Sequence, residues 1–376
     1  MARTGDTVTI ALTGDAMLGR GIDQILAHPS QPELYEPYIS SAVSYVELAE
    51  QAHGVIPRRV DPTYVWGDAL ATLARLGPDL RIVNLETAIS RSDEPAPKGI
   101  NYRMHPGNVE CLRAFAIDCC VLANNHVLDW DAAGLIETVE TLEGAGIRFA
   151  GAGRNAAEAR APATLDIADK GRTVLFAFAL DSAGVPSDWA ARARTAGVNF
   201  LPKLSKETAA QIGAQLAAIR RSGDISIASL HWGPNWGYDI SQEQRAFAYH
   251  LIDRGFDVIH GHSSHHAKAI EIHRGKLILY GCGDFINDYE GISGHDAFRD
   301  DLALVYLAEI SCRDGRLRRL RLIPFQIERF CLKRAGASDV SWLAATLDRE
   351  SRPFGTRVVV TGDMHLEVAA ADPAPS

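Results

Sequence analysis

The sequence lacks the features that would place it in a membrane or on nucleic acid. No run in its 376 residues approaches the about 18 consecutive apolar residues that span a bilayer. The N-terminal residues form no apolar segment of the kind found in signal peptides, so we expect a cytoplasmic protein with no membrane span. The net charge of −9 argues against a nucleic-acid surface, because phosphate binding depends on lysine and arginine. A small or peptide-like anionic substrate is compatible with this net charge, since a local metal ion or cationic side chain overrides the electrostatic field of the whole protein.

The sequence also lacks the cysteine pattern of a disulfide framework or a thiolate zinc site. None of its six cysteines forms a CxxC pair, and several lie in apolar runs, which indicates buried free thiols. Apolar residues make up 47% of the chain and charged residues 23%, as is typical of a soluble globular protein. Neither figure indicates an oligomeric state.

Short apolar runs alternate with amphipathic stretches over the first two thirds of the chain. The runs predict buried strands at residues 8–12, 80–83, 119–122, 174–179, 225–230 and 258–260. The stretches predict helices at residues 134–145, 206–221 and 243–254. This order predicts a layered α/β fold.

The remaining segments complete one predicted domain over residues 1–368. From about residue 266 we expect mainly antiparallel strands, at 269–273, 277–280, 303–310 and 317–324. The arginine-rich segment 313–321 is predicted to form the edge strand of a hairpin, since charge often protects such edges. Residues 29–65 show no clear period and are interpreted as an insertion and candidate cap. Residues 369–376 are expected to be a frayed tail.

Polar residues follow five of the predicted strands directly. In open α/β sheets, functional groups gather beyond the carboxyl ends of strands. Asp15 follows the first strand, where it either caps a helix or faces a site, and Arg20 either pairs with it or awaits an anionic substrate. Asn84 and Glu86 follow the second strand and, two residues apart, share one face. Asn124, Asn125 and His126 follow the third, and burying them is costly unless they satisfy one another or an ion.

The last two strand ends contribute histidines and aromatic residues. His231 follows the strand at 225–230, and a lone histidine there is more often structural than a ligand. Trp232, Trp236 and Tyr238 next to it suit either a pocket wall or a core. The densest cluster is the four histidines within residues 260–266, which are ligands or, alternatively, solvent-exposed side chains gathered by chance.

The donor types at the five strand ends favour one or two divalent ions. Carboxylate, amide and imidazole donors suit ions of intermediate hardness such as Mn, Zn or Fe. Two such ions at about 3.5–4 Å hold a hydroxide and clamp the oxygens of an in-line displacement. The residues alone therefore predict metal-assisted hydrolysis.

The order of these motifs resembles the CapA family of poly-γ-glutamate capsule biosynthesis proteins. The motifs are Gly14-Asp15, Asn84-Leu85-Glu86, Asn124-Asn125-His126, His231-Trp232-Gly233 and Gly261-His262-Ser263-Ser264-His265. Residues 270–285 also match the family segment that follows the histidine motif. The family looks like a branch of the calcineurin-like metallophosphatases, which implies a four-layer α-β-β-α sandwich.

The resemblance implies a role for each motif residue. The implied ligands are Asp15 for a first ion, Glu86 as the bridge, Asn125, His231 and His262 for a second ion, and His265 returning to the first. His126 is implied to protonate the leaving group. Arg20 is predicted to be a catalytic residue that contacts the substrate, and the predicted substrate-binding residues are Asn84, Trp232, Trp236 and Tyr238.

Two positions depart from the metallophosphatase pattern. Met17 stands where a ligand histidine is usual, and a thioether is a poor ligand for a hard divalent ion. The last motif is stretched to His262-x-x-His265, so His260, His266 or Asp284 are candidate replacement ligands.

Three functions follow from this pattern. The first is a metal-dependent hydrolase that acts on a phosphoester or on an amide such as a γ-glutamyl linkage. The second is a non-catalytic accessory protein that binds poly-γ-glutamate and has a degenerate metal site. The third is a biosynthetic enzyme for a small metabolite built on the same fold.

Overall fold

The structure, a computed structural model, describes residues 7–370 and contains two large mixed β-sheets. The larger sheet has the order β19 (Thr356–Val360), β20 (Leu366–Ala370), β17 (Leu317–Ile327), β16 (Leu302–Ser311), β1 (Thr7–Ala16), β2 (Leu80–Leu85), β5 (Cys119–Val121) and β6 (Arg148–Ala150). β15 (Asp284–Ile286) pairs with β1, and β18 (Leu332–Arg334) pairs with β17.

The second sheet lies against the first. Its order is β13 (Ile270–His273), β14 (Lys276–Leu279), β12 (Val258–His262), β11 (Ile225–His231), β9 (Gly171–Ala179) and β8 (Ala163–Ile167). Two short pairs stand apart, β3 (Ala88–Ile89) with β4 (Arg103–Met104) and β7 (Ala152–Gly153) with β10 (Gly197–Val198).

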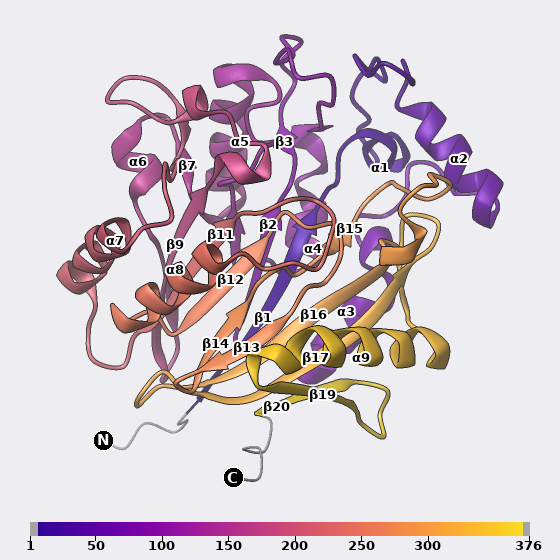
Figure 1. The fold of residues 1–376 in the computed structure, drawn as a ribbon. Helices are drawn as coiled ribbons and strands as arrows, with labels where there is room; N and C mark the ends of the chain where they lie inside the picture. The colour runs from indigo at the N-terminus through magenta and orange to yellow at the C-terminus, as the bar shows by residue number, and fades with distance from the viewer. Residues whose placement is uncertain (1–6, 371–376) are drawn as a thin grey trace.

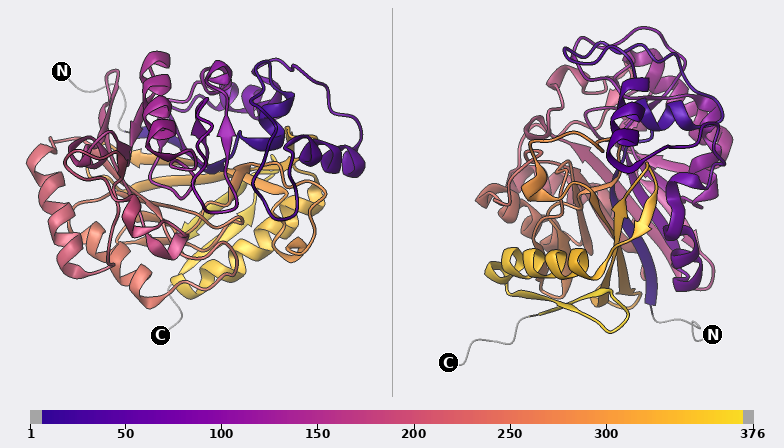
Figure 2. Two further views of the ribbon diagram at one scale, coloured as in Figure 1. Left: turned by 90° about the horizontal axis from the view of Figure 1, so that it is seen from above. Right: turned by 90° about the vertical axis from the view of Figure 1, so that its right-hand side faces the viewer.

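Helices cover the outer faces of the two sheets, as seen from above in Figure 2. α7 (Lys206–Ile219), α8 (Gln242–Asp253) and α9 (Ala337–Ser351) lie on one side. α3 (Gly67–Leu76), α4 (Glu110–Ala114) and α5 (Asp131–Ala145) lie on the other, while α1 (Arg20–Ile25), α2 (Val43–His53) and α6 (Ala156–Arg160) lie toward the top of the view in Figure 1. The molecule is therefore a four-layer α-β-β-α sandwich, as predicted.

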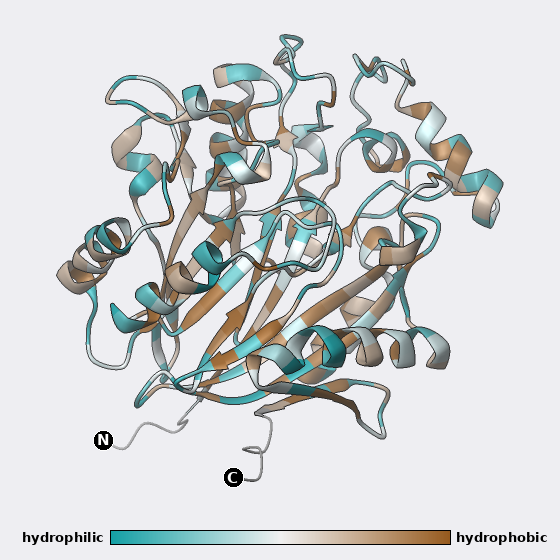
Figure 3. Ribbon diagram, in the orientation of Figure 1, coloured by the Kyte–Doolittle hydropathy of each residue, from teal (hydrophilic) through white to brown (hydrophobic). Residues whose placement is uncertain are grey.

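The alternation of side chains between the two faces of each strand explains why the protein has two hydrophobic cores. In β9, Val174, Phe176 and Phe178 pack with α7 and α8, whereas Leu175 and Ala177 pack against the larger sheet. Successive side chains of a strand point to opposite faces, so one strand serves both cores. The apolar strands and the polar outer faces of the helices are visible in Figure 3.

The predicted strands and helices of the first two thirds are confirmed, as are the antiparallel pairs β13–β14 and β16–β17. The edge-strand prediction for residues 313–321 is wrong. The hairpin forms, but β20 pairs with the far side of β17, so β17 is internal. Arg318 and Arg319 are exposed, Arg319 pairs with Glu367 of β20, and Arg321 is half-buried.

The segments without a clear pattern contain more structure than the sequence indicated. Residues 29–65 include α2, whose Tyr45 reaches the cleft described below, and the cap role of this segment stays a prediction. Helix α9 was not predicted. Residues 369 and 370 end β20, while 371–376, the rest of the expected tail, lie outside the described residues. No helix within residues 7–370 combines the length and apolar character needed to cross a bilayer.

Candidate metal centre

The strand registers bring the five motifs together at one end of the sheets. Asp15 on β1 is paired with Asn84 on β2 and, on its other side, with Asp284 on β15. His231 on β11 is paired with His262 on β12. β1 and β2 run parallel, as do β11 and β12, so the residues at their carboxyl ends lie at the same edge of each sheet, and Asp284 joins them from the start of β15.

The backbone around Asp15 is tightly packed. A Cβ atom at residue 14 would lie 1.7 Å from the carbonyl oxygen of Gly283, so only glycine fits there. The same carbonyl accepts a hydrogen bond from the Asp15 N–H at 3.0 Å. Gly14 therefore lets β15 approach β1, and this places Asp284 beside Asp15.

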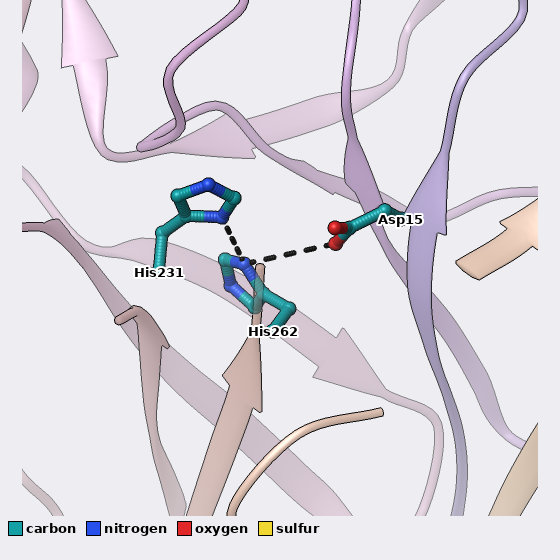
Figure 4. A group of neighbouring side chains, drawn as sticks. All are labelled: Asp15, His231 and His262. Carbon is teal, nitrogen blue, oxygen red and sulfur yellow. Dashed lines mark hydrogen bonds and ion pairs between the residues drawn. The ribbon is translucent and has the colours of Figure 1, made fainter. Parts of the chain in front are cut away.

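Asp15, His231 and His262 form the centre of the site, shown in Figure 4. Each offers a ligand atom, and these atoms all lie within 4.8 Å of one another. The Nδ1 atom of His262 lies 2.8 Å from Nδ1 of His231 and 4.0 Å from Oδ1 of Asp15. The other carboxylate oxygen of Asp15 is buried without a hydrogen-bond partner. A buried orphan oxygen of this kind is expected where a cation binds.

Glu86 and Asn125 extend this group. Nε2 of His231 lies 3.0 Å from Oδ1 of Asn125 and 3.6 Å from Oε1 of Glu86. The Asn84 amide donates to Asp15 at 2.7 Å and also donates to Glu86. Asn84 therefore holds the two carboxylates side by side, and its own oxygen accepts from Asn124 at 3.0 Å.

His265 and Asp284 form a second part of the site, on the far side of Asp15. Nδ1 of His265 lies 3.0 Å from Oδ1 of Asp284, whose other oxygen accepts from Asn287 at 2.8 Å. Burial opposes a charge on His265, but the carboxylate of Asp284 outweighs it and raises the pKa of His265 above its usual value. Asp284, a candidate extra ligand from the sequence, thus lies among the predicted ligands.

The charge balance of the buried side chains suits a divalent cation. Burial, and then the neighbouring Asp284, raise the pKa of Asp15 to about 8. Burial and Asp15 raise the pKa of Glu86 well above its usual range. Burial lowers the pKa of His231 and His262 well below theirs, so both rings are neutral and can donate lone pairs. Crowded carboxyl groups and neutral imidazoles are the donor set that a divalent cation stabilises.

His126 lies at the rim of this group with its ring fixed on two sides. Its Nδ1 lies 2.6 Å from Oδ2 of Asp129, and its ring stacks on Tyr102 at 3.9 Å between centroids. Lys98 donates to Oδ1 of Asp129 at 2.6 Å and also to the backbone carbonyl of Asn125. Burial lowers the pKa of His126 to about 4, so the ring is neutral at neutral pH. Because Asp129 accepts the Nδ1 proton, the Nε2 atom is left for a substrate.

A cleft of about 360 Å³ opens above these residues. It is lined by Asp15, Glu86, Asn125, His126 and His265 from the predicted set, together with Arg20 and Trp236. The sequence did not indicate the other lining residues, which include Lys98, Tyr102, Asn235, Tyr289, His295 and Asp300. These residues lie in loops without a strand to mark them. One feature of the sequence could have marked Lys98 as a candidate. It is the only cationic residue in the proline-containing segment 92–102, which precedes Arg103.

Arg20 reaches the cleft but already has two carboxylate partners. It pairs with Asp288 at 2.5 Å and with Glu36 at 2.9 Å, and its guanidinium lies 3.7 Å from the centre of the Tyr45 ring. Of the two alternatives for Arg20, pairing with Asp15 does not occur. Arg20 ties residues 36–45 to the loop after β15 and forms part of the cleft wall, and its catalytic role stays a prediction.

The remaining predicted residues divide into those at the cleft and those in the core. Trp236 lines the cleft and stacks on His295 at 3.8 Å. Trp232 is buried, and its Nε1 donates to the Tyr280 carbonyl at 2.9 Å, so no substrate can reach it. Asn84 is likewise fully buried between Asp15 and Glu86, which corrects its assignment to the substrate. Tyr238 packs outside the cleft.

Two further histidines of the cluster at 260–266 lie away from the ligand atoms. His266 is buried between Tyr238 and Phe298 and does not line the cleft. His260 is fully buried behind His262. Neither belongs to the Asp15, His231 and His262 cluster, so their assignment as replacement ligands has no support in the geometry.

Comparisons with known proteins identify the family. The structure of a 5'-nucleotidase precursor from Thermus thermophilus aligns over 90% of this chain and 58% of its own, at 13% identity and a TM-score of 0.43. At that score the likeness supports no inference about the site. A probable polyglutamine synthesis accessory protein of Mycobacterium tuberculosis is 47% identical, over 99% of this chain and 98% of that protein.

A second relative and the family model also connect this chain to capsule synthesis proteins. The PGA biosynthesis protein CapA of Bacillus subtilis is 23% identical over 75% of this chain and 64% of its own length. The model of the bacterial capsule synthesis protein family PGA_cap matches residues 9–289, which include every residue of the candidate metal centre. This chain therefore belongs to the PGA_cap family of bacterial capsule synthesis proteins.

Proposed function

We propose that this protein is a metal-dependent hydrolase that acts on an anionic substrate in the metabolism of poly-γ-glutamate or a related polymer. The observation that carries the proposal is the convergence of Asp15, Glu86, Asn125, His231 and His262 beneath one cleft. Structural ion pairs do not explain this group, because an oxygen of Asp15 has no partner and the imidazoles are neutral. The names of the relatives, which concern polyglutamine synthesis and capsule biosynthesis, support this process.

The donor set divides between two cation positions. Asp15, His265 and Asp284 would hold one ion, Asn125, His231 and His262 would hold the other, and Glu86 lies between the two groups. Asp284 supplies the carboxylate that compensates for Met17. When bound, divalent ions polarise the scissile group and neutralise the negative charge that develops on it.

The protein's own side chains supply the rest of the chemistry. His126 faces the cleft with Nδ1 held by Asp129, so its Nε2 is the atom that passes a proton to the leaving group. The ring is neutral at rest with a lone pair on Nε2, so Nε2 would first accept the proton that the attacking water releases and then pass it to the leaving group. Lys98, which is 22% exposed at its side chain, offers a cation to an anionic substrate in a protein whose net charge is negative.

One observation favours a second function. The Mycobacterium tuberculosis relative is described as an accessory protein. In that alternative the cleft binds an anionic polymer through Lys98 and the aromatic side chains, and no bond is cleaved.

We expect metal-loaded protein to hydrolyse one of two chromogenic probes, a nitrophenyl phosphoester or a γ-glutamyl nitroanilide. The reason is that each probe carries an anionic group that Lys98 can contact and a leaving group that His126 can protonate. The measurement is nitrophenol or nitroaniline release with Mn, Zn or Fe, and with chelator as the control. Bound metal with no release from either probe, combined with binding of poly-γ-glutamate, would favour the accessory function instead.

A further inference from the structure

Two tyrosines from distant parts of the chain meet in the wall of the cleft. Tyr102 lies directly before β4 and Tyr289 follows β15, and both line the cleft. Their hydroxyl oxygens lie 2.9 Å apart, and within residues 7–370 neither hydroxyl makes another hydrogen bond. The role of His126 and the role of the metal centre use neither of these hydroxyls.

Both tyrosine rings are fixed in place by the two sides of the site. The Tyr102 ring stacks on His126 with 3.9 Å between centroids, and its backbone N–H donates to the same carboxylate that holds His126. The Tyr289 ring meets the His265 ring edge-on, with 5.4 Å between centroids. The hydroxyl pair therefore connects the wall that carries the general acid to the wall that carries the predicted metal ligand His265.

The two hydroxyls carry two hydrogens, but the contact between them uses only one. A tyrosine hydroxyl keeps its hydrogen at neutral pH and accepts as well as donates. One hydroxyl therefore donates to the other, and the hydrogen of the accepting hydroxyl has no partner in the described part of the chain. A hydroxyl that already accepts one hydrogen bond is a stronger donor for the next. The pair thus offers one hydrogen to a ligand in the cleft.

An anionic ligand needs such a donor because the cleft offers it few cationic side chains. The lysine and arginine side chains that line the cleft are Lys98 and Arg20. Arg20 is buried and already paired with two carboxylates, so its charge is balanced within the protein. A ligand with more than one anionic oxygen must therefore bind neutral donors in addition to Lys98.

We propose that Tyr102 and Tyr289 form a shared hydrogen-bond donor that binds an anionic oxygen of the substrate. The oxygen belongs to a phosphoryl group or to a carboxylate, which have this chemistry in common. The inference rests on the proposed function for the anionic character of the ligand. Either hydroxyl can supply the hydrogen, because removing one frees the other from the contact between them. The two tyrosines therefore substitute for each other, and only the loss of both removes the donor.

The test is a calorimetric titration of the protein in the presence of Mn, with inorganic phosphate and separately with glutarate as the carboxylate probe. We expect Tyr102→Phe and Tyr289→Phe each to lower anion affinity only slightly, because the remaining hydroxyl keeps its hydrogen. The double variant should lower affinity about 10–100-fold, the usual worth of a hydrogen bond to a charged group. A loss with one probe alone supports the pair and identifies the oxygen as phosphoryl or carboxylate.

Tyr64→Phe is the matched control. The Tyr64 hydroxyl donates to the Arg329 carbonyl at 2.9 Å away from the cleft, so this variant should bind both probes as the wild type does. Carbon-13 NMR of tyrosine labelled at Cζ is a second readout that needs no double variant. Phosphate should shift the signals of Tyr102 and Tyr289 in the wild type and leave that of Tyr64 unchanged.

Three results would overturn the shared donor. They are a wild type that binds neither probe, a double variant that binds both as tightly as Tyr64→Phe, and bound phosphate that shifts neither tyrosine signal. Failure of the proposed function looks different. Anion binding that depends on the pair, in a protein that releases neither chromogen, would leave the shared donor standing and overturn the hydrolase. Probe hydrolysis at the wild-type rate in the double variant would do the reverse.

Discussion

Replacing His126 by alanine is expected to lower kcat by about 10²–10⁴-fold, the usual contribution of a general acid, while metal affinity stays near that of the wild type. The reason is geometric. His126 is bonded to Asp129 rather than to the Asp15, His231 and His262 cluster. Asp129 keeps Lys98 and the Tyr102 N–H as partners in the variant, so no buried charge is left unpaired. Single-turnover kinetics with the responsive probe, together with metal titration, measure both quantities.

The contrasting variant is His265→Ala, on the other side of the cleft. His265 pairs with Asp284 beside Asp15, so its removal should weaken metal binding first and turnover as a consequence. Loss of metal from His126→Ala would make His126 a ligand and overturn its role as the acid. Turnover unchanged in that variant would show that another group protonates the leaving group.

Replacing Asp15 by asparagine is expected to change stability in opposite directions with and without metal. In metal-free protein at pH 8, the buried carboxylate faces Asp284 with one oxygen unpartnered, so its removal should raise the free energy of unfolding. The gain is of the order of a few kcal/mol, since each pKa unit corresponds to about 1.4 kcal/mol. With metal, the variant loses a charged ligand and should be less stable than wild type. Chemical unfolding with and without metal measures both effects.

The pH dependence of this effect has a fixed sign. Asp15 has a folded pKa of about 8 against an ordinary value of 3.8, so the metal-free protein loses stability as pH rises between those values. The Asp15→Asn variant should lack this loss. The matched control is Asp348→Asn, because arginines stabilise that carboxylate and hold its pKa at about 2, so its removal should destabilise the protein at pH 7. Destabilisation of metal-free Asp15→Asn at pH 8 would show that the protein alone satisfies the carboxylate.

Much of the site was predictable because its residues follow strands. Asp15, Glu86, Asn125, His231 and His262 each end an apolar run, and parallel strands bring such ends together without further information. The fold was predictable for the same reason, since alternating apolar strands and amphipathic helices specify layers. The position of Asp284 could not be predicted from the strand pattern, because its place beside Asp15 depends on the short strand β15 and on Gly14.

The residues that the sequence did not reveal depend on tertiary packing. Lys98 and Asp300 lie in loops, and only the folded chain shows that they line the cleft. Trp232 follows a strand as His231 does, but the alternation of the strand turns its ring into the core. Helix α9 and the pairing of β20 with β17 arise from the last third of the chain, where the apolar pattern indicated strands alone.

The most direct measurement of the central claim is metal binding by the purified protein after chelator treatment. Titration with Mn, Zn and Fe, followed by calorimetry and by the thermal unfolding temperature, should show one or two ions bound per chain. The unfolding temperature should rise with metal concentration, because a ligand of the folded state stabilises it by mass action. His262→Ala should lose most of both signals. Protein that binds none of these ions and shows no change in unfolding temperature would contradict the metal centre and, with it, the hydrolase.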